Sequence, residues 1–404
     1  MPDAHATIEL VARSAYGKLV AYLSARTRDV ASAEDALGEA LLEALATWPR
    51  DGVPAQPEGW LLTAARHRLL DQQRRARARE RHEAELASLA DGALSADPGG
   101  FPDERLGLFF VCAHPALDPS LHAPLMLQAV LGLEAARIAP AFLVSTAAMA
   151  QRLVRAKTKI REAGIPFEVP PEHELPRRLE SVLEALYAAY GLGWDAILGA
   201  DASARDLAEE ALWLARVLAQ RMPEEPEVRG LLALLLFCES RRAARRPGGA
   251  YVPLSEQDPA LWSEVRIQEA EAELAAAARR GRPLGRFQLE AAIQSVHADR
   301  RRTRTTDWAA IALFYEHLLR LAPTLGARIG HAVAVAEARD AEAGLALLDG
   351  LERASVSAHQ PYWAVRAHLL KRLGRAEEAT QAYDLALGLT REEAVRRFLR
   401  ARRG

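Results

Sequence analysis

The sequence has few of the residues that build disulfide frameworks, zinc modules or membrane spans. Its 404 residues include only two cysteines, Cys112 and Cys238, which lie far apart and outside any C-x-x-C spacing. This usage argues against a zinc or disulfide scaffold and is typical of a reducing compartment. The longest apolar run, LLALLLFC from Leu231, is far shorter than the roughly 20 residues of a membrane helix, and MPDAHATIEL is not ordered like a signal peptide. We therefore expect a cytoplasmic protein without a membrane role.

Catalytic and cofactor-binding signatures are also missing. The chain has no Walker loop, no G-x-G-x-x-G, no H-E-x-x-H and no G-x-S-x-G. His114 follows Cys112 in VCAHPAL, but the neighbours are apolar and no third group is placed to orient the pair, so buried packing explains both residues better. We expect a protein that is not an enzyme, with no cofactor and no metal.

The composition favours helices. Half of the residues are hydrophobic, and Ala, Leu, Arg and Glu dominate while Thr, Ile and Tyr are sparse. Straight-chain residues keep their rotamer freedom in a helix, whereas strands prefer β-branched and aromatic ones, so we predict an almost all-α fold. The length suggests about two to three domains. The formal net charge of −2 neither supports nor excludes nucleic acid binding, because charge is concentrated in local blocks.

The helical pattern is divided by segments rich in Pro and Gly. Residues 8–85 are predicted to be helices broken by one loop, WPRDGVPAQPEGW at 48–60. The small and polar residues 87–103 indicate a linker. Apolar periodicity returns over 104–163 and predicts a second compact unit, and from Leu179 onward helix follows helix to the C-terminus.

A cationic helix is predicted over LVSTAAMAQRLVRAKTKIRE, residues 143–162. An apolar stripe recurs at helical spacing along Met149, Leu153, Ala156 and Ile160, and Ser145 or Thr146 is placed to cap the first free amides. The other faces carry Gln151, Arg152, Arg155, Lys157, Lys159 and Arg161. A short helix in residues 132–145 and a turn near Leu143 precede it, as in a helix-turn-helix whose second helix enters a major groove. The spacing fits a solvated surface helix equally well.

Two further charged helices stand out in the N-terminal part. ARHRLLDQQRRARARER, residues 65–81, has an inner apolar face and crowds Arg66, Arg68, Arg74, Arg75, Arg77 and Arg79 around it. Such a face attracts phosphates by releasing counterions, although it also fits a solvated helix end. On residues 31–48, Asp35, Glu39 and Glu43 are four apart and line one face, which invites a basic partner or is simply solvated.

The C-terminal part repeats a hairpin theme. Residues 332–351 and 362–389 are each predicted to form helix, tight turn and helix. In the second hairpin, six residues resemble the tetratricopeptide pattern, namely Leu373, Gly374, Arg375, Ala379, Tyr383 and Ala386. Several such hairpins in tandem predict a helical-repeat domain.

Taken in order, these parts resemble a bacterial RNA polymerase sigma factor of the extracytoplasmic function group. The resemblance rests on AEDALGEALLEALATWP, PEGWLLTAARHRLLDQQRR and, most specifically, AFLVSTAAMAQRLVRAKTKIREAGIPF. EEPEVRGLLALLL and FQLEAAIQSVHADR extend it to the subgroup with a long C-terminal extension of tetratricopeptide-like repeats. The implied all-α fold has a sigma-2 helical bundle at 1–86, a linker at 87–103, a sigma-4 helix-turn-helix domain at 104–166 and a helical extension at 167–404.

The resemblance also implies roles for the charged helices. Asp35, Glu39 and Glu43 would bind core polymerase. The 48–60 loop with Arg66, Arg68, Arg74 and Arg75 would meet the −10 promoter element. The −35 element would be read by Ser145, Thr146, Gln151, Arg152, Arg155, Lys157 and Lys159. The expected function is a transcription initiation factor whose partners are core RNA polymerase and promoter DNA, with a small regulatory protein or a ligand at the C-terminal repeats.

Several residues depart from that family's pattern. Gly38 stands where a Gln is usual, His67 where an Asn is frequent, and Gly330-His331 where Asn-Arg is found. Pro140 falls inside the first helix of the helix-turn-helix, where it can cost about 3 kcal/mol unless the helix ends there. These departures leave open a helical-repeat interaction scaffold with a degenerate sigma-like N-terminal part. A dedicated DNA-binding repressor or activator would need a dimerisation element, and none is evident.

Overall fold

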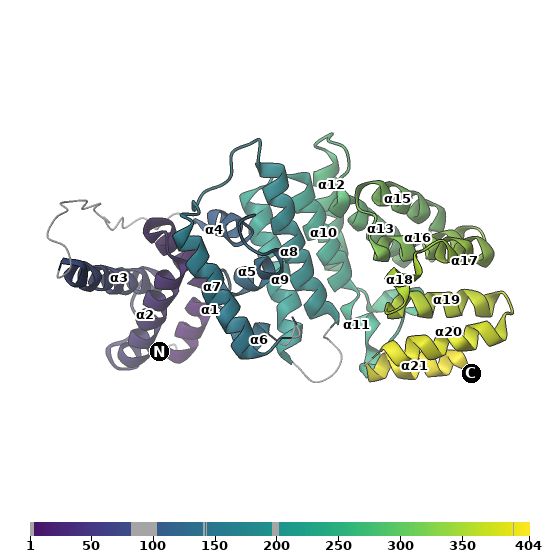
Figure 1. Ribbon diagram of the computed structural model, residues 1–404, viewed down its shortest axis with the longest axis horizontal. Helices are drawn as coiled ribbons and strands as arrows, with labels where there is room; N and C mark the ends of the chain where they lie inside the picture. The colour runs from purple at the N-terminus through teal and green to yellow at the C-terminus, as the bar shows by residue number, and fades with distance from the viewer. Residues whose placement is uncertain (1–3, 82–102, 140–141, 143, 196–201, 391) are drawn as a thin grey trace. The chain divides into compact units, whose positions relative to one another are not determined.

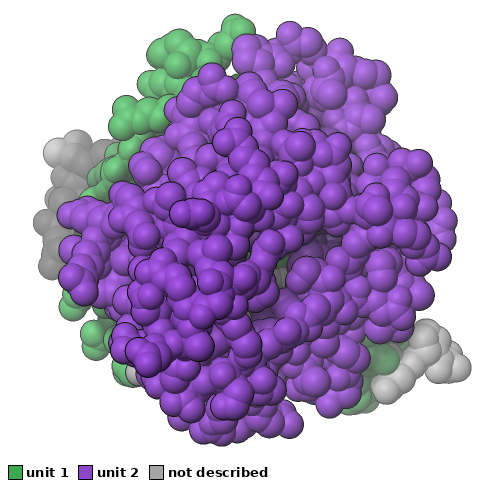
Figure 2. Space-filling view, turned by 90° about the vertical axis from the view of Figure 1, so that its right-hand side faces the viewer, with its two compact units in different colours: residues 1–194, 202–211 green, residues 195–201, 212–404 purple. Residues whose placement is uncertain are grey.

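The structure, a computed structural model, describes residues 4–81, 103–139, 142, 144–195, 202–390 and 392–404 (Figure 1). Throughout these residues the regular structure is helical and no strand occurs, which confirms the predicted all-α fold. Apart from Asp103, the expected linker at 87–103 lies outside the described residues. In the described ranges no helix is both long and apolar enough to cross a membrane. The chain divides into unit 1, residues 1–194 with 202–211, and unit 2, residues 195–201 with 212–404 (Figure 2).

Unit 1 begins with three helices packed on one another, α1 (Ala4–Thr27), α2 (Val30–Asp51) and α3 (Pro57–Arg81). Asp29 caps α2 by accepting hydrogen bonds from the amides of Ala31 and Ser32. The predicted loop at 48–60 is shorter than expected, because α2 continues through Pro49 and only residues 52–56 separate the helices. Gly52 sets the end of α2: its φ of 91° suits glycine, and its amide donates to the Trp48 carbonyl over 3.0 Å.

The remaining helices of unit 1 are α4 (Arg105–Cys112), the 3₁₀ turn η1 (Pro119–Leu121), α5 (His122–Ala129), α6 (Ala135–Ile138), α7 (Thr146–Glu162) and α8 (Leu175–Asp195). Of these, α4 and α5 pack against α1, and α7 packs against α2 and α6. Gly17 lets α1 approach the chain after α5 so closely that a Cβ there would overlap the backbone oxygen of Val130. Phe109, Phe110 and Met126 are fully buried between these helices. The two N-terminal domains predicted from the sequence therefore share one compact unit.

Residues beyond α7 also belong to unit 1. Arg178 of α8 donates to the carbonyl of Phe110 over 2.9 Å, and the Phe167 carbonyl lies against Gly107 in α4. The segment from Phe167 into α8 therefore covers α4. The domain boundary predicted at residue 166 remains a prediction, but ending the chain near this residue would expose α4 to solvent.

Unit 2 is a succession of helices in which chain neighbours pack on each other. Its long helices are α10 (Pro226–Ser240), α12 (Glu264–Ala278), α13 (Arg286–Ala298), α15 (Trp308–Leu321), α16 (Leu325–Ala338), α17 (Ala341–Asp349), α19 (Gln360–Arg372), α20 (Ala376–Leu389) and α21 (Glu393–Arg403), together with the end of α9 (Ala202–Arg221). Short connecting helices are α11 (Arg242–Arg245), η2 (Pro247–Gly249), η3 (Leu254–Glu256), η4 (Pro259–Leu261), α14 (Arg300–Thr303) and α18 (Arg353–Val356).

Both predicted C-terminal hairpins are present. α16 and α17 form the first, and a Cβ on Gly344 would overlap Ala336, so glycine allows their close approach. α19 and α20 form the second, with Gly374 at φ 72° in the turn. Ala379 and Tyr383 are buried in the cluster shared with α19, as the pattern predicted.

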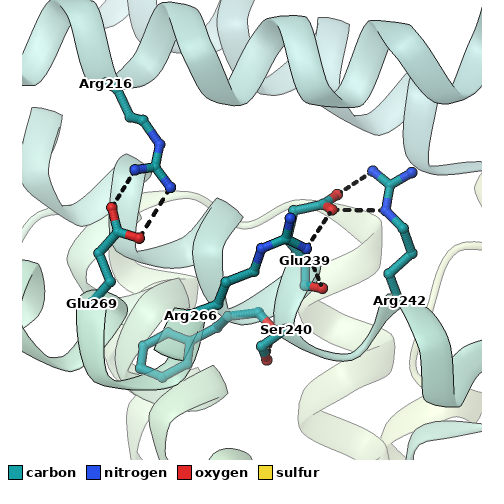
Figure 3. Close-up of polar contacts among 7 residues, drawn as sticks. Arg216, Glu239, Ser240, Arg242, Arg266 and Glu269 are labelled. Atoms are coloured by element: carbon teal, nitrogen blue, oxygen red, sulfur yellow. Dashed lines mark hydrogen bonds and ion pairs between the residues drawn. The ribbon is translucent and has the colours of Figure 1, made fainter. Parts of the chain in front are cut away.

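Ion pairs fix α9, α10 and α12 on one another in unit 2 (Figure 3). Arg216 pairs with Glu269 through both guanidinium nitrogens. The Glu239 side chain, 1% exposed, accepts from Arg242 Nε over 2.7 Å and lies 3.5 Å from Arg266 Nη1. A buried carboxylate is costly unless it is paired and hydrogen-bonded, so these contacts hold the register of the three helices.

Candidate nucleic-acid interface

The cationic helix predicted over residues 143–162 is α7. Ser145 is its N-cap, and the Ser145 hydroxyl accepts from the amide of Ala148 over 3.2 Å. The predicted stripe is buried at Met149, Leu153, Ala156 and Ile160. Before it, α6 ends at Ile138, ahead of Pro140, which lies outside the described residues. Because α6 ends before Pro140, the proline does not interrupt the hydrogen bonds described for this helix.

Most of the polar residues predicted on α7 are exposed. Gln151, Arg152 and Arg155 face away from the stripe, as does Lys159 one turn further on. Ser145 and Thr146 are exposed at the start of the helix. These six residues are accessible to a ligand along one side of the helix.

Lys157 is different, and the expectation that it lies on the exposed cationic face is wrong. Its Nζ lies 2.5 Å from Oε2 of Glu34 in α2, and both side chains are only 10% exposed. Burial raises the pKa of Glu34 above its usual range, against the lowering effect of the Lys157 charge. Arg161 Nη1 contacts Asp29 Oδ2 at 3.4 Å. Two ion pairs therefore attach α7 to the N-terminal end of α2.

The acidic strip on α2 is met by the basic helix α3. Arg68 contacts Glu39 Oε2 at 3.5 Å and Glu43 Oε2 at 3.1 Å, in a partly solvated setting. Asp35 is exposed one turn before Glu39. Beside these acids, Leu42 is 67% and Leu45 40% exposed. The two exposed leucines on one helix face make it a candidate protein-docking surface, and the acids beside them set its charge.

The basic residues predicted on α3 do not all face solvent. Arg66 is buried, with 7% exposed, and its Nη2 has no hydrogen-bond partner. It falls between Leu62 and Leu69 on the inner stripe, which explains why it cannot serve as an exposed phosphate contact here. Arg74 is exposed and lies 3.9 Å from Asp71. Arg75 lies in α3, but its side chain is outside the described set.

A small cavity lies beside Arg68. It has a volume of about 340 Å³ and is lined by Glu43, Trp60, Thr63, Ala64, His67, Arg68 and Asp71. The Trp60 ring packs edge-on against Trp48, with centroids 5.4 Å apart. The loop is visible in the sequence, but the cavity is not, because it forms only where α2 and α3 lie side by side.

Cys112 and His114, the pair considered from the sequence, lie apart from this surface in function, and no metal-ligand cluster of three His, Cys, Asp or Glu side chains is found among the described residues. Cys112 is buried, and burial raises the pKa of its thiol well above the usual range. His114 Nδ1 accepts from the Ala116 amide over 3.1 Å, which makes it part of a turn rather than the partner of Cys112.

Comparison with known proteins agrees with this reading of the N-terminal part. Residues 11–79 match the Sigma-70 region 2 family, and residues 178–278 match a family of unknown function, DUF6596. Yeast Tom70 aligns with 99% of this chain and 83% of its own at 11% identity, but a TM-score of 0.32 is too low to show a shared fold.

One relative spans nearly the whole chain. "Uncharacterized protein R00370" of Rhizobium meliloti (strain 1021) is 40% identical over 401 residues, which are 96% of this chain and 92% of that protein. The Sigma-70 region 2 match covers most of α1, all of α2 and most of α3, and the acidic strip and the 340 Å³ cavity lie on α2 and α3. The chain therefore belongs to the family of the Rhizobium meliloti protein R00370, and its N-terminal part makes it a sigma-factor-like protein.

Proposed function

We propose that this protein is an alternative sigma factor of the extracytoplasmic function group. It binds core RNA polymerase, recognises −10 and −35 promoter elements, and carries a C-terminal regulatory domain of tetratricopeptide-like repeats. The observation that carries the proposal is the Sigma-70 region 2 match over residues 11–79. Within that range the charged faces of α2 and α3 lie next to each other, joined by Arg68.

In this proposal the exposed face of α2 docks on core polymerase. Asp35, Glu39 and Glu43 supply the negative charge, and Leu42 and Leu45 supply apolar area at its centre. Charge sets the orientation and the rate of association, whereas buried apolar side chains supply much of the affinity. Gly38 lies on this helix with open space around it, so a larger residue there would extend the same surface.

The −10 element meets α3 and the residues between α2 and α3. Arg68, Arg74 and Arg75 contact phosphates, and the 340 Å³ cavity takes one unstacked base. Trp60 offers a ring for stacking, and His67 and Asp71 offer edge hydrogen bonds. Arg66 acts from inside by supporting α3, because its side chain is buried.

The −35 element meets α7. Gln151, Arg152 and Arg155 read base edges or phosphates, Lys159 contacts the backbone, and Ser145 and Thr146 lie where the helix N-terminus approaches a phosphate. Lys157 and Arg161 join them only after α7 leaves α2, since both are held by acids in the described arrangement. In this proposal, the described arrangement is a closed form of the factor.

The test is transcription in vitro with purified core polymerase on the protein's own upstream DNA. The full chain is compared with a version ending at Arg221, which keeps residues 202–211 of unit 1, because a cut at Gly164 would uncover α4. Arg152→Ala with Arg155→Ala should abolish the specific transcript, whereas the matched pair Arg320→Ala with Arg339→Ala, on exposed positions of unit 2, should not. Activity confined to the shortened chain would make the extension an inhibitor.

A helical-repeat scaffold with a degenerate sigma-like part is the second candidate. The observation in its favour is that two predicted DNA contacts, Arg66 and Lys157, are buried. A pull-down of core polymerase, performed alongside the transcription assay, distinguishes this scaffold from a sigma factor. If neither the full chain nor the shortened one binds core polymerase or yields a transcript, the scaffold is the better account.

A further inference from the structure

Unit 2 encloses a cavity that the proposed promoter and polymerase contacts do not use. Its volume is about 620 Å³, and its walls come from η3 with the residues before it, from the helices α13 to α16, and from α19, α20 and α21. Pockets of 300–1,000 Å³ are the usual size for small organic ligands. The cavity joins helices that are more than 100 residues apart in the chain, from His297 to Arg402.

One part of the lining is apolar and aromatic. Leu369, Tyr383 and Leu399 are buried, and each contributes to the wall. The Phe398 ring packs edge-on against Tyr251, with centroids 5.2 Å apart. Val365 and Phe398 of the same wall are only partly buried, and a ligand body that covers them would gain affinity from the apolar area removed from water.

Another part of the lining is cationic without matching acids. Arg300 donates to the carbonyls of Ser255 and Gln257 over 3.0 and 2.6 Å, and no carboxylate among the described residues pairs with it. Arg304, at the rim, likewise has no ion pair with a described residue. By contrast, the lining acids Glu256 and Glu337 already pair with Arg402 and Arg372. The excess charge at the Arg300 end is therefore positive.

A buried guanidinium adds to this field. Arg241 is 8% exposed, its Nη1 has no hydrogen-bond partner, and no described carboxylate pairs with it. The pKa of His297, on the cavity wall, is lowered to about 3, mainly by burial and further by the positive charges of Arg241 and Arg300. His297 is therefore neutral at physiological pH, and it packs edge-on against Trp308 with centroids 5.3 Å apart. A buried positive charge without a counter-ion favours an anionic ligand nearby.

Gly330 helps to shape this wall. A Cβ at this position would overlap the Tyr315 hydroxyl, so glycine lets the Tyr315 ring lie against α16. Both residues line the cavity. The Gly330 departure noted in the sequence thus has a place in the structure, as part of the cavity rather than as a lost polar contact.

We propose that this cavity binds a small amphipathic organic anion. The acidic group lies at Arg300 and Arg304, and the apolar or aromatic body lies on Ala364, Val365 and Phe398. The inference does not rest on the sigma-factor proposal, because it concerns binding to unit 2 alone. Its test is direct binding, so the two proposals fail separately.

The test titrates the full chain with two anionic probes, 8-anilinonaphthalene-1-sulfonate and decanoate, followed by fluorescence and by calorimetry. The neutral counterpart N-phenyl-1-naphthylamine shows whether the acidic group matters. We expect one saturable site for both anions and binding of the neutral probe at least about tenfold weaker, since a charge-assisted contact to guanidinium is lost.

Variants locate the site. Arg304→Gln should weaken both anions about tenfold or more, while Arg320→Gln, an exposed cation outside the cavity, should change binding less than twofold. Val365→Trp should fill the space and abolish binding; Ala364→Leu is the second filling variant if the first melts at a lower temperature. Absence of a saturable site, equal binding of the neutral probe, or full binding by a folded filling variant would each overturn the proposal. Saturable binding of an acidic peptide without either probe would overturn it as well.

Discussion

The Lys157–Glu34 ion pair allows the free energy that holds α7 on α2 to be measured. Both side chains are 10% exposed and their charged atoms are 2.5 Å apart. Removing one partner of a buried pair leaves an uncompensated charge and costs about 3–5 kcal/mol. Lys157→Met keeps the apolar stem and removes the charge. Because burial already raises the pKa of Glu34, its carboxyl can take up a proton, which limits the loss at pH 7 to roughly 2–3 kcal/mol.

Hydrogen exchange on the full chain measures this loss without requiring that both units unfold together. A local loss of 2–3 kcal/mol speeds amide exchange in α7 by roughly 30–150-fold. Peptides from α19 in unit 2 serve as the internal reference. Arg155→Met, on the exposed side of the same helix, should leave α7 exchange unchanged within about twofold.

The sign of the pH dependence follows from the raised pKa. A carboxyl whose pKa is higher in the packed state stabilises that state as pH falls through this value, so the defect of Lys157→Met should shrink from pH 8 to pH 5. Adding Glu34→Gln should restore α7 protection to within about 1 kcal/mol of the parent, because neither charge is then buried. Exchange of α7 within threefold of the parent, or a double variant as fast as the single one, would refute this reasoning.

Three other outcomes test the packing. Gly17→Ala should lower the stability of unit 1 by about 1–3 kcal/mol, because its methyl would overlap the Val130 backbone, whereas Gly38→Ala, in open space, should raise it by roughly 0.5–1 kcal/mol. Calorimetric melting distinguishes them, and equal shifts would contradict the contact at Gly17. Between pH 7 and pH 5, unit 2 should lose roughly 2 kcal/mol, since the His297 pKa falls from 6.5 to about 3 on folding. His297→Gln should lose less in urea titrations, and an unchanged pH slope would count against this origin.

Features with a local cause could be predicted from the sequence. The α7 stripe at Met149 and Leu153 follows from helical spacing, and the cap at Ser145 follows from its hydroxyl beside a free amide. The same holds for the two hairpins, whose turns are marked by Gly374 and by the Asp340 cap. In each case the residues that decide the structure are within a few positions of it.

Features with a distant cause could not. Lys157 is buried because Glu34, 123 residues earlier, offers it a carboxylate, and no pattern around Lys157 indicates this. The cavity in unit 2 likewise depends on Arg300 and Arg402 meeting across several helices. Arg66 is an exception, because its burial could have been predicted. It lies four residues after Leu62 and three before Leu69, which places it on the inner face of the helix.

Arg68 has a consequence beyond geometry. Its guanidinium contacts both Glu39 and Glu43. In the proposed roles, Arg68 belongs to the DNA-binding surface and the two carboxylates belong to the polymerase-binding surface, so each surface partly neutralises the charge of the other. Whichever macromolecule arrives first releases the residues that the other needs. Linkage between two binding equilibria is reciprocal, so each ligand must strengthen the other by the same factor. Exposed pairs are each worth about 0–1 kcal/mol, so the two pairs limit that factor to about thirtyfold at most. In the proposed roles, the free chain would therefore bind each partner more weakly alone than in the presence of the other.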